Sequence, residues 1–157
     1  MHTVELLLDE GLEAWTRGLW RRLREAGLPS LDTHRHPTNR PHLTLLSAAA
    51  LEGLPPLPLP VEVELQGARM LGRALVLGVR PAPAVTAVRA LAWAALDGVE
   101  RWPAPVEWVP HVSLALKVPV ERRAAAVRLF GDLEPMRGWC TAARSYDTVT
   151  RTVVGLS

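Results

Sequence analysis

Two short segments of the sequence place a histidine two residues before a hydroxyl side chain. One reads Pro-His-Leu-Thr-Leu and contains His42 and Thr44; the other reads Pro-His-Val-Ser-Leu and contains His111 and Ser113. An imidazole, with an unperturbed pKa of about 6.5, serves as acid or base near neutral pH. One ring can take a proton from an attacking water or hydroxyl while the other gives a proton to the leaving oxygen. Because hydroxyls donate to the non-bridging oxygens of a phosphate, the pattern favours phosphoryl transfer without a metal.

The shared frame of the two motifs separates them from chance matches. Both have Pro before the His, an apolar residue between the His and the hydroxyl, and Leu after the hydroxyl. A third match, His36-Pro37-Thr38, lies in a proline-containing segment with no apolar strand around it, and we interpret it as a coincidence. Either motif alone is explained equally well as an ordinary histidine on a half-buried strand. The matching pair favours a functional role.

Strand geometry would bring each imidazole and its hydroxyl to one face. Successive side chains of a strand alternate between faces, so His42 and Thr44 share one face and the leucines beside them share the other. The same alternation applies to His111 and Ser113. Each strand would bury its apolar residues against helices and present the polar pair on the opposite side.

Further residues near the motifs are candidates for substrate contacts. Arg40 would share the face of His42 if the strand begins there, and a guanidinium suits phosphate; an exposed arginine at a strand edge is the simpler interpretation. Tyr146, at the start of the last expected strand, would stack on a nucleobase or pack at the rim. Trp102 and Trp108 flank the approach to the second motif, and the sequence does not distinguish between them.

Composition and residue counts exclude several classes of protein. The net charge of +2 is too small for a chain that coats nucleic acid, and no Walker loop is present. Cys140 is the only cysteine, which excludes an intrachain disulfide and fits a reducing cytoplasm. His34 and His36 lie in an expected loop, where histidines are usually just solvated, so neither a metal nor a cofactor is expected. With no basic leader and no run of about 18 apolar residues, we expect one cytoplasmic domain spanning 1–157.

Hydrophobic periodicity predicts the element order β-α-β-β-β-α-β-α-β. Asp9 is the expected N-cap of the first helix, and Gly27 and Asp97-Gly98 stop the first and second helices. Segments 29–41, 51–60 and 100–105 are expected connectors, the second because it carries four prolines. The expected strands are 3–8, 42–46, 61–65, 74–79, 109–118 and 146–154, and the expected helices are 9–26, 85–96 and 119–131.

The recurrence of the motif strand after 69 residues, with helices in both halves, predicts a duplicated architecture. We expect an α/β fold of the α+β type, bilobal and pseudo-twofold. Antiparallel sheets would carry helices on their outer faces and leave the opposite faces for a central cleft.

In its two motifs and in its element order, the chain resembles the 2H phosphoesterase superfamily, including 2',5' RNA ligase-like proteins and RNA 2',3'-cyclic phosphodiesterases. The resemblance covers nearly the whole chain. It implies that His42 and His111 are the catalytic pair, that Thr44 and Ser113 bind the phosphate, and that RNA ends or small nucleotides are the substrates. Segment 51–60 departs from the family, whose members often have a helix there, which puts the substrate shape near that lobe in doubt.

Three functions from different classes follow from these observations. The first is a metal-independent phosphoesterase that hydrolyses 2',3'-cyclic or 2',5' phosphodiesters, and the motif pair favours it. The second is an RNA ligase running the same chemistry backwards, and the third is a catalytically silent RNA-binding module. The sequence leaves open the direction of the reaction, the natural substrate, the oligomeric state and which histidine is the acid.

Overall fold

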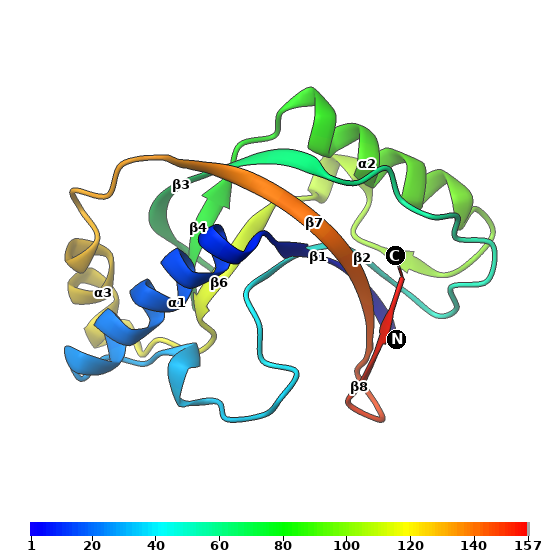
Figure 1. Cartoon of the computed structure of the whole chain (residues 1–157). Helices are drawn as coiled ribbons and strands as arrows, with labels where there is room; N and C mark the ends of the chain where they lie inside the picture. Colours follow the sequence, from blue (N-terminus) through cyan, green and yellow to red (C-terminus); the bar gives the residue numbers. More distant parts are fainter. Residues whose placement is uncertain (157) are drawn as a thin grey trace.

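A computed structural model describes residues 1–156, and an antiparallel sheet of eight strands organises them (Figure 1). The strands are β1 (His2–Leu8), β2 (His42–Ala48), β3 (Val61–Leu71), β4 (Ala74–Val79), β5 (Arg101–Trp102), β6 (His111–Ala115), β7 (Met136–Asp147) and β8 (Thr152–Gly155). The α-helices are α1 (Glu10–Glu25), α2 (Pro83–Ala95) and α3 (Arg123–Leu129), and 3-10 turns cover Leu31–Thr33, Pro105–Glu107 and Val120–Arg122. The expected α+β class with antiparallel strands is confirmed.

The sheet forms a circuit of paired strands. The order β1-β2-β6-β4-β3-β7 returns to β1, because β7 pairs with β1 as well as with β3. β8 pairs with β7, and β5 pairs with β2. The motif strands β2 and β6 meet in this circuit at one residue pair, Leu43 with Val112. These two residues occupy the same position in their motifs, so the motif repeat is centred on their contact.

Helix α1 begins where the sequence predicts. Oδ1 of Asp9 accepts a hydrogen bond of 2.7 Å from the amide of Leu12, and Oδ2 accepts one of 2.8 Å from the amide of Trp139 in β7. Asp9 therefore caps the helix and ties its first turn to the sheet. The helix stops at Gly27, whose φ of 72° lies in the left-handed region that glycine adopts without strain.

The helices bury the apolar side of the motif strands. In Figure 1, α1 and α3 lie at one end of the curved sheet and α2 lies at the other. Arg22 of α1 donates a hydrogen bond of 3.2 Å to the carbonyl of Leu129 and stacks on Phe130, so α1 and α3 are in contact. α1 contacts β6 and β7, and α2 contacts β2 and β3. Both helices therefore support a motif strand from the core side.

The last part of the chain differs from the prediction. The expected strand 146–154 is wrong: β7 already begins at Met136, and a turn separates it from β8. The sequence of β7 contains few β-branched residues, so its local strand preference is weak. β7 is stabilised instead by its pairing with β1, β3 and β8, which the local sequence does not show.

Smaller boundaries also differ from the prediction. β3 continues to Leu71 through a bulge between Leu65 and Ala68, which breaks the alternation that marks a strand. β6 ends at Ala115, so the expected strand 109–118 is too long, and the expected loop 100–105 contains β5. The proline-rich connector 51–60 contains no helix or strand, as predicted. Among residues 1–156, every helix is too short or too polar to cross a membrane.

Candidate active site

The two motifs lie side by side where β2 pairs with β6. Leu43 pairs with Val112 in an antiparallel register. Side chains one step before and after this pair alternate with it in direction. His42, Thr44, His111 and Ser113 therefore all point to the face opposite Leu43 and Val112, around the one residue pair that joins the two strands.

Burial divides the motif strands into two faces as the sequence predicts. The four polar motif side chains are partly exposed, whereas Leu43 and Val112 are 1% and 0% exposed. Leu45 and Leu114 are equally buried on the helix side. We name the opposite side, which carries the polar motif residues, the motif face.

Each histidine is held in the same way by the backbone just before it. Nδ1 of His42 lies 2.7 Å from the carbonyl oxygen of Arg40, and Nδ1 of His111 lies 2.7 Å from the carbonyl oxygen of Val109. A carbonyl only accepts, so in both rings Nδ1 carries the proton and donates. Nε2 is then the unprotonated nitrogen of each neutral ring. Both Nε2 atoms are therefore available as bases, and as acids once protonated.

The hydroxyl positions are also supported symmetrically. The indole of Trp20 in α1 donates a hydrogen bond of 3.1 Å to the carbonyl of Ser113, and the indole of Trp108 donates one of 3.2 Å to the carbonyl of Thr44. Neither hydroxyl is hydrogen-bonded to another group among residues 1–156. Both hydroxyls are free to donate to a phosphate.

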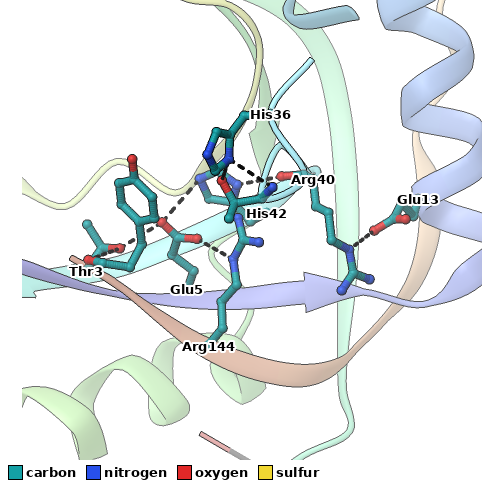
Figure 2. Close-up of polar contacts among 9 residues, drawn as sticks. Thr3, Glu5, Glu13, His36, Arg40, His42 and Arg144 are labelled. Atoms are coloured by element: carbon teal, nitrogen blue, oxygen red, sulfur yellow. Dashed lines mark hydrogen bonds and ion pairs between the residues drawn. The ribbon is translucent and has the colours of Figure 1, made fainter. Parts of the chain in front are cut away.

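A buried ion pair lies beside His42 and has no counterpart beside His111 in the part of the chain described. Oε1 of Glu5 accepts a hydrogen bond of 2.8 Å from Nε of Arg144, and Oε2 accepts one of 2.7 Å from the hydroxyl of Thr3. The same Oε2 lies 3.6 Å from Nε2 of His42, a contact that is an ion pair only when the ring is protonated. Figure 2 shows these four side chains directed toward one another from β1, β2 and β7.

Arg40 and Tyr146, the two further candidates for substrate contacts, lie in surroundings that the sequence did not predict. The guanidinium of Arg40 is occupied, because its Nε donates a hydrogen bond of 3.0 Å to Oε1 of Glu13 (Figure 2). Its backbone carbonyl, by contrast, orients His42. Tyr146 lies near the end of β7 instead of at the start of the last strand, and it pairs with Thr3 of β1. It is partly exposed, one row away from the Glu5–Arg144 pair.

Arg69 and Gln66 of β3 lie on the motif face, a placement that the sequence pattern does not predict. A Cβ atom on Gly78 would lie 3.6 Å from Nε of Arg69 and 3.7 Å from Oε1 of Gln66. Gly78 pairs with His111, so these two side chains cover the motif face beside His111. Arg69 makes no hydrogen bond or ion pair with any of residues 1–156. The placement of Arg69 depends on which residues of β3 and β6 lie next to Gly78 of β4. A single sequence does not give this register between strands.

A buried arginine, Arg89, lies on the helix side of the motif strands, and the sequence pattern does not predict its contacts. Nε of Arg89 donates a hydrogen bond of 3.2 Å to the carbonyl of Leu45, and its NH2 group donates to the carbonyl of Pro103. Its guanidinium stacks on Trp108, 5.3 Å from the ring centre. Burial, and then the charge of Arg101, lowers the pKa of Arg89. Arg89 thereby links α2, β2 and the loop that leads into the second motif.

The remaining polar groups near the motifs do not form a further reaction centre. Nδ1 of His36 lies 2.7 Å from the hydroxyl of Thr38, within the exposed loop before β2. Among residues 1–156, no three His, Cys, Asp or Glu side chains gather as a metal site would require. Surface hollows of about 430 and 380 Å³ lie along Glu62, Arg80 and Arg137 and between α1 and α3, respectively, and neither is lined by a motif residue.

Comparison with known proteins identifies the fold. The structure entitled Crystal Structure of MHV ns2 PDE Domain superposes with a TM-score of 0.66, at 17% sequence identity, and the match covers 98% of each chain. No protein-family model matches the sequence, and no curated protein matches it. The chain therefore has the fold of that PDE domain over nearly its whole length.

Proposed function

We propose that this protein is a phosphodiesterase that opens 2',3'-cyclic or 2',5' phosphodiesters of RNA or nucleotides by acid–base catalysis. His42 and His111 are the catalytic pair, and Thr44 and Ser113 hold the phosphate. The observation that carries the proposal is the pair of Nδ1-to-carbonyl hydrogen bonds, which direct both histidines to work through Nε2. The fold shared with a PDE (phosphodiesterase) domain supports the same class of reaction.

The reaction follows from the protonation states of the two rings. Nε2 of the neutral histidine takes a proton from a water molecule as the water oxygen forms a bond to phosphorus. The bond from phosphorus to the leaving ester oxygen breaks, and Nε2–H of the protonated histidine gives that oxygen its proton. The two rings exchange states, and proton exchange with solvent restores them. The reverse sequence joins two ends, so the same residues also support ligation.

The hydroxyls stabilise charge that builds on the phosphate. In the transition state the non-bridging oxygens become more negative, and preorganised donors there lower the barrier. Both hydroxyls point to the same face as the two rings, at the junction of β2 and β6. A phosphate centred on these four side chains would meet both donors and both Nε2 atoms.

The test is turnover of a nucleoside 2',3'-cyclic phosphate and of a short RNA with that terminus, in the presence of a chelator. Wild-type protein is compared with His42→Ala, His111→Ala and the control His36→Ala, which removes an exposed histidine of the unrelated third match. We expect a loss of at least about 10²-fold in kcat for each motif variant and no change for His36→Ala.

The outcomes separate the proposed function from its alternatives. Turnover that survives in either motif variant, or that requires an added divalent metal, contradicts the two-histidine mechanism. Absence of wild-type turnover together with RNA binding that His42→Ala and His111→Ala leave intact supports the silent binding module. Joining of RNA ends by the wild type, lost in both variants, assigns the ligase direction.

A further inference from the structure

An exposed tryptophan stands next to the first motif strand. Trp102 of β5 is 64% exposed and pairs with Ser47 near the end of β2. Single exposed apolar side chains are common on protein surfaces, so the position of Trp102 beside the motif strand is informative and its exposure alone is not. The loop from Trp102 to His111 adds Val106, which is 93% exposed, and Val109, which is 37% exposed. Three exposed apolar side chains, Trp102, Val106 and Val109, thus lie in the segment that leads to the second motif.

Trp102 points to the motif face of the sheet. Its neighbour Arg101 pairs with the buried Ala48 and stacks on Trp93 of α2, 4.2 Å from the ring centre, so Arg101 points to the helix side. Successive residues of a strand point to opposite faces. The indole of Trp102 is therefore directed away from α2.

Register connects Trp102 to the catalytic cluster. Ser47, the partner of Trp102, also pairs with Thr3 of β1, and Thr3 pairs with Tyr146 of β7. Directly paired residues share a face, so Trp102, Ser47, Thr3 and Tyr146 form one row across the sheet. The hydroxyl of Thr3 donates to Oε2 of Glu5, and this oxygen lies 3.6 Å from Nε2 of His42. The row and the histidines thus lie on the same face.

The distance between the row and the cluster suits one nucleotide. Ser47 is three positions after Thr44 on β2, which corresponds to about 10 Å at roughly 3.3 Å per residue. Across the sheet, Trp102 is one strand spacing from Ser47, about 4.8 Å. A phosphate at Thr44 and a base over Trp102 are therefore separated by a length that a nucleotide covers.

We propose that Trp102 is the nucleobase-stacking residue of this site, with the hydroxyl of Ser47 beside it as a polar contact. The inference rests on the proposed function and assigns the substrate class: nucleotides and RNA ends that carry a planar base, in preference to sugar phosphates without one. Base–aromatic stacking contributes about 1–3 kcal/mol per base and tolerates all bases. Trp102 therefore selects for a base without selecting its sequence.

The experiment measures binding and turnover separately. Calorimetric titration gives Kd for adenosine 3'-monophosphate and for ribose 5-phosphate, which lacks the base. Turnover is measured with adenosine 2',3'-cyclic phosphate and with methyl riboside 2,3-cyclic phosphate. The variants are Trp102→Ala, Trp102→Phe and, as a matched control, Trp139→Ala, which removes another exposed indole from β7. Unfolding curves check that each variant is folded.

We expect Trp102→Ala to weaken adenosine 3'-monophosphate binding about 10- to 100-fold, from the stacking energy above, and to leave ribose 5-phosphate binding unchanged. Trp102→Phe should retain most of the affinity, and Trp139→Ala all of it. An equal loss for both ligands, no loss in Trp102→Ala, or no wild-type preference for the nucleotide overturns the inference. If binding follows this pattern while the wild type turns over neither cyclic phosphate, the proposed reaction fails and the base subsite stands.

Discussion

The carboxylate of Glu5 lies against the imidazole of His42, with Oε2 3.6 Å from Nε2, while Oε1 accepts a hydrogen bond of 2.8 Å from Arg144. Glu5 and Arg144, which form an ion pair, are both nearly fully buried. A buried charge is tolerated when it is paired, and removing one partner leaves the other without compensation. The stability of the motif face therefore depends on keeping the pair intact.

Arg144→Met should lower the free energy of unfolding by about 3 kcal/mol, because it leaves the Glu5 carboxylate buried and unpaired. The double variant Glu5→Gln/Arg144→Met should lose less than the sum of the two single variants, since it removes both charges. Urea unfolding of the four proteins measures the coupling. Strictly additive losses would mean that the two side chains do not depend on each other in the folded protein.

Thr44→Val should lower kcat/KM of the proposed reaction about 10²-fold, the usual effect of removing one preorganised donor to a developing oxyanion. Valine keeps the shape and the strand preference of threonine, so the change isolates the hydroxyl. Thr44→Ser, which keeps that donor, should stay within a few-fold of the wild type. The measurement is steady-state turnover of a nucleoside 2',3'-cyclic phosphate. Wild-type activity in Thr44→Val would remove Thr44 from the phosphate site.

Arg69→Ala should raise KM about 10-fold at low ionic strength, because it removes an unpaired guanidinium from the motif face beside His111. The effect should shrink as salt is added, since a partly exposed charge is screened. Arg73→Ala is the control: it removes an equal charge from the turn between β3 and β4. If both variants change KM equally, the effect comes from net charge and not from the position of Arg69.

The motif strands could be predicted from the sequence because their pattern is local. His42 and Thr44 alternate with leucines over a few residues, and the burial of that strand follows the alternation. Asp9 was predictable as a helix cap for the same reason, since its role depends on the three residues that follow it. The recurrence of the motif predicted a duplicated architecture, but the direct pairing of β2 with β6 was not predicted, because this contact joins distant parts of the chain.

The supporting residues could not be predicted because they depend on register between distant strands. Glu5 lies in an apolar run that reads as a buried strand, and its partner Arg144 is 139 positions away. Arg144 itself lies in β7, the strand whose sequence has little strand preference. Arg69 reaches the motif face beside His111 because Gly78, the partner of His111, leaves room for its side chain. The periodicity of a local segment does not predict any of these contacts.

Cys140 provides a test of the β7 placement that does not depend on function. Its thiol is buried where β7 meets both β1 and β3, and burial, together with the charge of Asp9, raises its pKa from 9.0 to about 12. Were residues 136–145 an exposed loop and not part of β7, the thiol would ionise and react like a free cysteine. Iodoacetamide at pH 8.5 should therefore leave the folded protein unmodified and alkylate it fully in urea, as followed by mass spectrometry.

The raised pKa also fixes the sign of a pH dependence. Between pH 9 and pH 12 the unfolded thiol loses its proton while the folded thiol keeps it, so the folded state binds more protons and stability falls as the pH rises. Cys140→Ala lacks this contribution. The wild-type free energy of unfolding should consequently fall faster than that of Cys140→Ala above pH 9, by at most about 1.4 kcal/mol per pH unit. Parallel curves for the two proteins would show that the thiol is ionised equally in both states, which a buried position in β7 does not allow.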